Sequence, residues 1–245
     1  KWDAKAAEKA GFEHFMMKEI HEQPKAVQDT LSSVIKNGTI DLSECGLSKE
    51  RIQSVGHIYI VACGSAYHAG MVAQYVIESL AKIPVRVDLA SEFRYRKPLL
   101  EKDGLVIIIS QSGETADSLA ALREAKGRGI KTLAIVNVVG SSIAREADDV
   151  FYTLAGPEIA VATTKAYSTQ LIAGYLLAVQ FAKVRGQIDE KRYSSLVKDL
   201  LALPDKMKRV LEDKERIQWF AAKFANAKDI FFSGRGIDYA VSMEG

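Results

Sequence analysis

The sequence has few of the features that mark specialised classes of protein. It contains only two cysteines among 245 residues, Cys45 and Cys63. This is too few for a disulfide framework, so a reducing, cytoplasmic location is expected. It has no apolar run long enough to cross a membrane and no signal peptide at its start, so a membrane is not an expected partner. The formal net charge is only +2 and the basic residues are dispersed, so nucleic acid is not an expected partner either.

Motifs for common cofactors are also missing. The four histidines show no metal-ligand spacing with one another or with the cysteines, so no metal site is expected. No strand is followed by G-x-G-x-x-G, and no Gly-Lys-Ser/Thr marks a Walker A loop, which argues against a dinucleotide or a nucleoside triphosphate. The sequence therefore predicts no cofactor. A hydrophobic content of 48% and a charged content of 26% are those of an ordinary globular protein of one or two domains.

The most informative feature that is present is a hydroxyl-rich turn at residues 110–115, Ser-Gln-Ser-Gly-Glu-Thr. It follows the branched apolar run 105–109, typical of a central parallel strand, and precedes a helical pattern at 116–125. Open α/β sheets bind ligands at such turns, and helix N-termini bind phosphate. Ser and Thr are also ordinary helix caps, but one cap needs only one hydroxyl. Ser110, Ser112 and Thr115 together favour a phosphate on a small molecule.

Strand and helix patterns alternate around this turn. Continuous or nearly continuous apolar runs predict strands at 57–62, 85–89, 105–109, 131–137 and 150–154. Helical spacing predicts helices at 67–82, 116–126 and 164–183, a shorter one at 141–146, and a short helix or a loop at 92–97. Such βαβ units predict an α/β fold with three layers, α-β-α, and a five-stranded parallel sheet.

The two ends of the chain differ from this centre. A helical lead-in covers residues 12–37, with a break at Pro24 and a turn at Asn37-Gly38. Residues 189–225 predict two amphipathic helices separated by Pro204. The segment 230–236 loosely repeats 58–64 and predicts the first strand of a second α/β unit, or else a sixth strand of the first sheet. The expected domains are a lead-in at 1–49, a first domain at 50–188 and a truncated second one at 189–245.

These residues also carry a family resemblance. The segments that match are 18–24, 62–65, 90–96, 110–115, 141–142, 161–166 and 234–236. Through them the chain resembles the isomerase part of the glutamine:fructose-6-phosphate aminotransferase family, which is built of two sugar isomerase (SIS) domains. Ser-Gln-Ser-Gly alone is common to SIS proteins, whereas Lys-Glu-Ile-x-Glu-Gln-Pro and Glu-Phe-Arg-Tyr-Arg are much narrower.

The resemblance implies a sugar-phosphate site. It assigns the phosphate to Ser110, Gln111, Ser112 and Thr115. It assigns sugar contacts to the turns that carry Ser65 and Thr163. Two family positions differ here: Ala66 stands where a serine hydroxyl is usual, and Thr163 replaces a serine.

The resemblance also implies the activity and the partners. In this family ammonia from a glutaminase domain aminates fructose 6-phosphate, and isomerisation gives glucosamine 6-phosphate. A homodimer is implied, and residues 2–11 resemble the linker from the glutaminase domain. The catalytic glutamate, histidine and lysine are expected beyond Gly236, and Glu244 is not that glutamate, so no catalytic residue is expected on this chain. The alternatives are another SIS aldose–ketose isomerase and a non-catalytic sugar-phosphate sensor, although residues 1–50 show no helix-turn-helix pattern.

Other reactive residues have simpler interpretations. Cys63 is expected to be a small thiol at a tight turn rather than a nucleophile. The basic cluster 94–97 is either a solvated face or a contact to phosphate or to a partner subunit. Ser141 and Ser142 are expected to cap a helix. Lys165 is not expected to form a Schiff base, because the resemblance places that lysine downstream.

Overall fold

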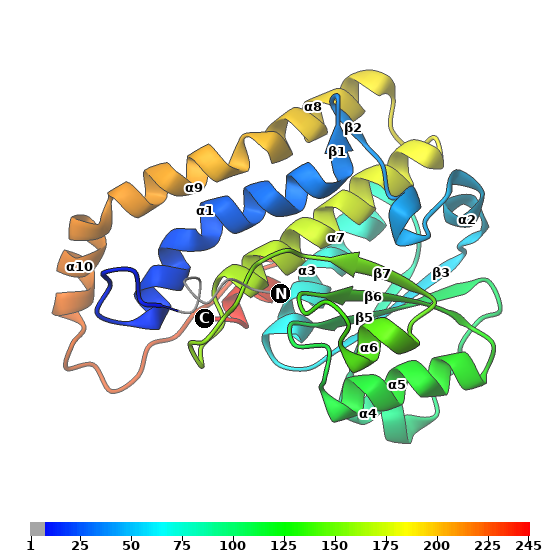
Figure 1. Cartoon of the computed structure of the whole chain (residues 1–245), viewed down its shortest axis with the longest axis horizontal. Helices are drawn as coiled ribbons and strands as arrows, with labels where there is room; N and C mark the ends of the chain where they lie inside the picture. Colours follow the sequence, from blue (N-terminus) through cyan, green and yellow to red (C-terminus); the bar gives the residue numbers. More distant parts are fainter. Residues whose placement is uncertain (1–7) are drawn as a thin grey trace.

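The computed structural model describes residues 8–245, so part of the expected linker at 2–11 lies outside the described residues. Its centre is a parallel sheet of five strands in the order β4-β3-β5-β6-β7 (Figure 1). The strands are β3 (His57–Ala62), β4 (Val85–Leu89), β5 (Gly104–Ser110), β6 (Lys131–Val136) and β7 (Asp149–Tyr152). The five-stranded parallel sheet predicted from the sequence is confirmed. Because the chain first adds β4 on one side of β3 and then β5 on the other, the strand order reverses between β3 and β5.

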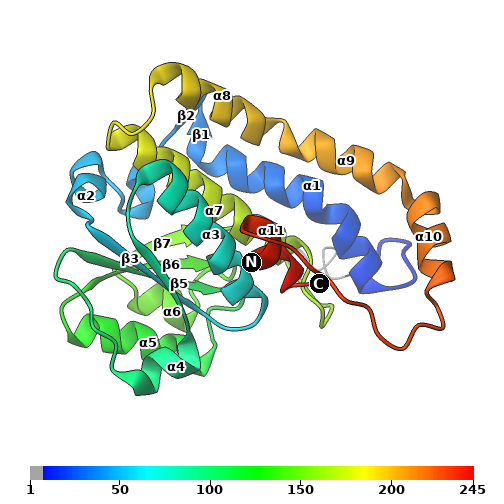
Figure 2. The ribbon, with the colours of Figure 1, turned by 180° about the vertical axis from the view of Figure 1, so that it is seen from behind.

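Helices cover both faces of this sheet (Figures 1 and 2). The longer ones are α1 (Phe15–Val34), α3 (Ser65–Ala81), α5 (Ala116–Gly127), α7 (Lys165–Val184) and α8 (Glu190–Leu201). The others are α2 (Lys49–Ser54), α4 (Ala90–Arg96), α6 (Ser142–Glu146), α9 (Leu203–Glu212), α10 (Lys214–Lys223) and α11 (Ile237–Ser242). None of the helices in residues 8–245 is long and apolar enough to cross a membrane.

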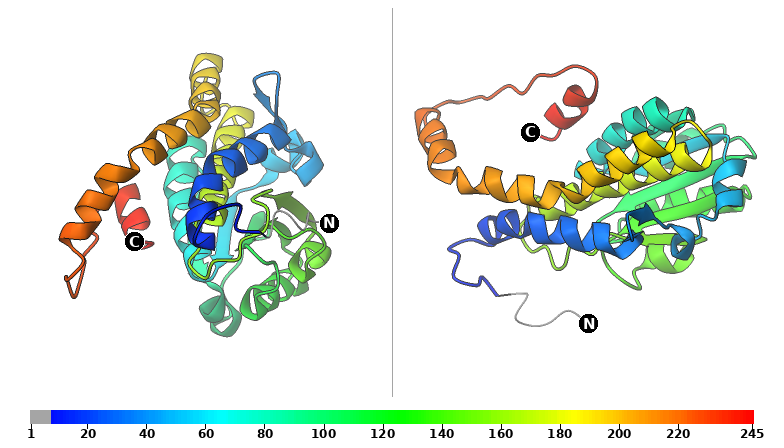
Figure 3. Two further views of the ribbon diagram at one scale, coloured as in Figure 1. Left: turned by 60° about the vertical axis from the view of Figure 1, so that its left-hand side comes forward. Right: turned by 90° about the horizontal axis from the view of Figure 1, so that it is seen from above.

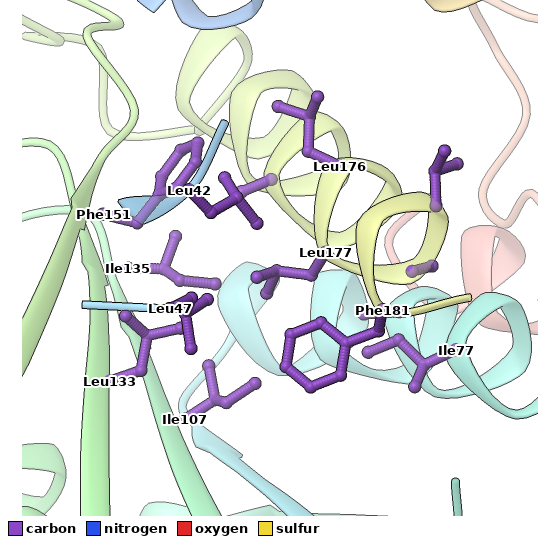
Figure 4. Close-up of a cluster of buried hydrophobic side chains, with 14 of the residues drawn as sticks. Leu42, Leu47, Ile77, Ile107, Leu133, Ile135, Phe151, Leu176, Leu177 and Phe181 are labelled. Carbon is purple, nitrogen blue, oxygen red and sulfur yellow. The ribbon is translucent and has the colours of Figure 1, made fainter. Parts of the chain in front are cut away.

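Strand side chains alternate between two buried clusters, because successive residues of a strand point to opposite faces. One cluster contains Ile58, Ile60 and Ile107 and packs on α1, α3 and α7. Figure 4 shows part of it, with Leu177 and Phe181 of α7 facing Ile107 and Leu133. The other cluster contains side chains from alternate positions of the same strands and packs on α4, α5 and α6. The three α-β-α layers predicted from the sequence are therefore present.

The predicted helix break at Pro24 is wrong. Helix α1 runs continuously from Phe15 to Val34 with Pro24 inside it. A proline lacks the N–H that would bond to the carbonyl four residues earlier, here Ile20. The side-chain amide of Gln23 donates to the Ile20 oxygen instead, at 3.1 Å. The lost backbone bond is thus replaced locally, and the helix continues.

The predicted turn at Asn37-Gly38 is confirmed. It joins two short antiparallel strands, β1 (Ile35–Lys36) and β2 (Thr39–Ile40). Asn37 and Gly38 have φ values of 54° and 75°. Asn and Gly adopt this left-handed conformation more readily than other residues, which is why this pair favours a tight hairpin.

The C-terminal part differs from the sequence prediction in two respects. Three helices, α8, α9 and α10, replace the two expected, and Pro204 lies in the first turn of α9 rather than between helices. Residues 230–232 form neither a first strand of a new sheet nor a sixth strand of the first one. A strand needs a neighbour to pair its N–H and C=O groups, and among the described residues this segment has none. Its Phe231 side chain is 91% exposed.

The turn after this segment does repeat the first one in backbone geometry. Gly64 precedes α3 with φ 57° and ψ −137°, and Gly236 precedes α11 with φ 59° and ψ −128°. Only glycine adopts this conformation readily. Figure 3 shows the chain leaving the end of α10 and returning toward the body of the molecule, where α11 contacts α3.

Candidate functional site

Two of the predicted site turns lie side by side at the carboxyl edge of the sheet. Strands β3 and β5 are hydrogen-bonded neighbours, with Ala62 opposite Ile109. The turn that contains Ser65 follows β3, and the turn 110–115 follows β5. Because the strand order reverses between these two strands, their turns diverge to opposite faces of the sheet. Doubly wound sheets bind ligands at such a reversal of the strand order.

The turn 110–115 is held by its own hydroxyl groups. The N–H of Gly113 donates to Ser110 Oγ at 3.0 Å, and Ser110 Oγ lies 3.2 Å from Thr115 Oγ1. The N–H of Glu114 donates to Ser112 Oγ at 3.2 Å, so the Ser112 hydroxyl keeps its own hydrogen for a ligand. Thr115 is the residue before α5, but its side chain makes no capping bond. The hydroxyl of Thr115 therefore does not serve as the helix cap considered from the sequence.

A second turn, between β6 and α6, braces this one. The N–H of Ile143 donates to the Gly113 carbonyl oxygen at 3.0 Å, and that of Ser142 donates to Glu114 Oε1 at 2.8 Å. The hydrogen bonds from Ser142 hold the pKa of Glu114 below its usual value. The sequence predicted that the Ser141 side chain caps α6, but it makes no capping bond. The Glu114 carboxylate accepts the N–H of Ser142 at the start of α6 instead.

Ser65 and Thr163 lie on the wall of one hollow. It has a volume of about 710 Å³ and is also lined by Tyr167, Glu244 and the tip residue Val161. Burial raises the pKa of Tyr167 to about 12, and its hydroxyl has no hydrogen-bond partner. The structure thus brings two of the predicted site residues into one hollow. Ser110, Gln111, Ser112 and Thr115 are not among the residues that line it.

Glu158 organises the turn that carries Thr163. Its carboxylate accepts hydrogen bonds from the N–H groups of Thr164 and Ala166 at the start of α7, at 2.8 and 3.2 Å. It also accepts the hydroxyl hydrogen of Thr163 at 2.8 Å. Thr163 can therefore only accept a hydrogen bond from a ligand hydroxyl. No local pattern identifies this role of Glu158, since its partners are mainly backbone groups that only the fold brings close.

Three of the basic residues considered from the sequence, Arg94, Arg96 and Lys165, form ion pairs. Arg96 pairs with Asp88 at 2.6 Å and Arg94 with Asp117 at 3.2 Å, which favours the interpretation of a solvated face. Lys165 is buried and pairs with Glu22 at 2.6 Å. Within residues 8–245 no group of three His, Cys, Asp or Glu side chains is placed to hold a metal ion.

The chain is similar in sequence and in structure to known proteins. It is 57% identical over its whole length to the glutamine–fructose-6-phosphate aminotransferase [isomerizing] of Clostridium tetani, and 48% identical to that of Methanosarcina mazei. In both cases it spans 40% of the relative's length. The C-terminal domain of the glucosamine-fructose-6-phosphate aminotransferase from Francisella tularensis superposes with a TM-score of 0.93 at 39% identity. That superposition covers 97% of this chain and 67% of the other.

The SIS domain family matches residues 51–180, from the start of α2 almost to the end of α7. This range contains the whole five-stranded sheet and all six of the predicted site residues. The chain therefore belongs to the SIS domain family.

Proposed function

We propose that this chain is the sugar-phosphate-binding portion of an enzyme that makes glucosamine 6-phosphate from fructose 6-phosphate and glutamine. The observation that carries the proposal is the turn 110–115, with its hydroxyls and the N-terminus of α5, at the point where the strand order reverses. The names of the relatives from Clostridium tetani and Methanosarcina mazei support the choice of reaction. Because the chain spans only 40% of those relatives, the whole activity belongs to a longer protein.

The proposed site has two parts. Ser110, Gln111, Ser112 and Thr115 bind the phosphate, and Ser65 and Thr163 bind the sugar. The free hydroxyl hydrogen of Ser112 supports the first assignment, and the shared hollow of Ser65 and Thr163 supports the second. Ala66 supplies no hydroxyl, so the sugar loses a contact that the family usually makes there.

The domains and the partners are also proposals. We propose a lead-in at 1–49, a first SIS domain at 50–188 and the start of a second at 189–245. The matching conformations of Gly64 and Gly236 support the second unit. A glutaminase domain of the same parent protein, a homodimer and a cytoplasmic location complete the proposal. Exposed apolar side chains on α10, among them Ile217 and Trp219, are consistent with a further packing partner.

Calorimetry with fructose 6-phosphate and with fructose tests the phosphate assignment. We expect the phosphorylated sugar alone to bind, because hydrogen bonds to a charged phosphate are the strong ones. Ser112→Ala should weaken binding about ten-fold, as the loss of one charge-assisted hydrogen bond does. Ser54→Ala, on α2, is the control and should bind like the unchanged chain. Equal binding of fructose and fructose 6-phosphate would contradict the assignment.

A further inference from the structure

The segment 18–24 of α1, Lys-Glu-Ile-His-Glu-Gln-Pro, has no place in the proposed function so far. Its charged side chains are unusually deep: Lys18 is 5% exposed and Glu19 is 1% exposed. Burying a charge is costly unless hydrogen bonds or ion pairs compensate. Lys18 pairs with Glu22 of the same helix at 3.4 Å, whereas the partners of Glu19, Glu22 and Gln23 also include residues of the loop 155–164 and the start of α7.

Glu19 binds the backbone of that loop. Its Oε1 accepts the N–H of Ile159 at 2.6 Å, and both of its carboxylate oxygens lie 3.3 Å from the N–H of Ala160. Two successive backbone N–H groups thus converge on one buried carboxylate.

Two further residues of the segment hold the start of α7. Glu22, one turn after Glu19, pairs with the buried Lys165 at 2.6 Å. The hydroxyl of Ser168 donates to Gln23 Oε1 at 2.6 Å. The NH₂ group of the same Gln23 side chain donates to the Ile20 carbonyl, in place of the N–H that Pro24 lacks. One face of α1 therefore fixes both the loop and the helix that follows it.

The loop is also fixed where it leaves the sheet. Asn137, at the end of β6, donates to the Gly156 carbonyl at 2.7 Å and accepts the N–H of Ala155 at 2.8 Å. Between these contacts and Glu158 the loop has little freedom, yet its tip residue Val161 is fully exposed beside the hollow. The position of Thr163 thus depends on contacts made far from it in the sequence.

We infer that Glu19 is a positioning residue for sugar recognition: through Ile159 and Ala160 it sets the place of the loop that presents Thr163 to the sugar. The hydrogen bonds of Glu19 go to Ile159 and Ala160 and not to the phosphate turn 110–115, so we expect Glu19 to affect the sugar end of the ligand and not the phosphate end. This inference rests on the proposed function for the identity of the ligand. It does not rest on it for the role of Glu19 in holding the loop.

The variant Glu19→Gln tests the role of Glu19 in holding the loop separately from the identity of the ligand. A glutamine has nearly the same shape, but one of its two polar groups is an NH₂ donor, which cannot accept an N–H. Asp29→Asn, an exposed residue of the same helix that pairs with Lys25, is the matched control. In the 245-residue chain without ligand, we expect the amides of residues 157–164 to exchange with deuterium about ten-fold faster in Glu19→Gln, because local opening becomes easier. Amides of the β5–α5 region should keep their rates, and Asp29→Asn should change neither. Equal acceleration across the chain, or none, would overturn the positioning role.

Calorimetry then tests the consequence for binding. We expect Glu19→Gln to bind fructose 6-phosphate about ten-fold more weakly while binding inorganic phosphate as before, since only the contacts at the sugar end are displaced. An equal loss for both ligands would show a general structural role and overturn the inference, as would unchanged binding of both. If the unchanged chain binds no fructose 6-phosphate, the proposed function fails, and the exchange experiment still decides whether Glu19 holds the loop.

Discussion

At the scale of single residues, Gly113 shows how closely the phosphate turn is fitted to its neighbour. Its φ is +67°, and a Cβ placed on it would overlap the Ser141 hydroxyl. We expect Gly113→Ala to lower the free energy of unfolding by about 2 to 4 kcal/mol, the sum of a left-handed alanine and an overpacked contact. Binding of fructose 6-phosphate should weaken as well, because the turn must move. Urea denaturation and calorimetry measure the two effects.

The control for this substitution lies in the helix that follows the turn. Gly127, near the end of α5, has open space around it and no positive φ, so Gly127→Ala should stabilise the chain by about 0.5 to 1 kcal/mol. A Gly113→Ala protein as stable as the Gly127→Ala protein would show that the turn tolerates a side chain and is not held as described.

Ser110, Ser112 and Thr115 could be predicted from their type and their position after a strand, whereas Gln111, Ser65 and Thr163 were predicted through the family resemblance. Ser65 and the turn 110–115 do lie at the carboxyl edge, because each directly follows a strand that the apolar pattern identified. Glu114 and Glu158 could not be identified in this way. Each accepts hydrogen bonds from the N-terminus of a helix that the fold places beside it, and nothing in the local sequence shows that proximity.

At the scale of elements, α1 offers a test of how a helix tolerates an internal proline. In the unchanged chain, replacing Gln23 by Ala leaves the Ile20 carbonyl without a donor, whereas with Pro24→Ala the new backbone N–H serves it. We therefore expect Gln23→Ala to cost about 0.5 to 1.5 kcal/mol more in the presence of Pro24 than in its absence, which is the net value of one hydrogen bond. The bond from Ser168 is lost in both backgrounds and cancels in the double-mutant cycle. Equal costs in the two backgrounds would refute the compensation.

The apolar pattern of the sequence predicted the strands of the central sheet correctly but predicted a strand at 230–232 that does not form. The difference is whether a neighbouring strand is present. The strands of the sheet, such as 57–62, are apolar on both faces and have neighbours to pair with in this chain. Residues 230–232 have a similar composition but no strand beside them among the described residues, and they stay unpaired. Composition gives the tendency to form a strand, but the partner decides whether one forms.

At the scale of the whole molecule, two charged groups near the carboxyl edge already have structural partners. Glu158 caps α7, and Lys165 forms a buried pair with Glu22. A further pair is formed by His68 and Glu244, whose Nδ1 and Oε2 atoms lie 2.7 Å apart between α3 and the segment after α11. A carboxylate at Nδ1 orients an imidazole for proton transfer, but His68 is not among the residues that line the hollow of Ser65 and Thr163, so it is not placed to reach a sugar bound there.

We therefore predict that the 245-residue chain alone forms no glucosamine 6-phosphate, even when fructose 6-phosphate and ammonia are both supplied. Supplying ammonia removes any need for a glutaminase, so a negative result cannot be assigned to the lack of that activity. Binding of the phosphate positions the sugar, but positioning alone moves no proton between its first two carbons. The assay compares product formation by this chain with that of a longer chain that carries a complete second SIS domain, and only the longer one should turn over. Turnover by the 245-residue chain would mean that catalytic groups lie on it after all, and Glu158→Gln and Lys165→Met would be the first variants to locate them.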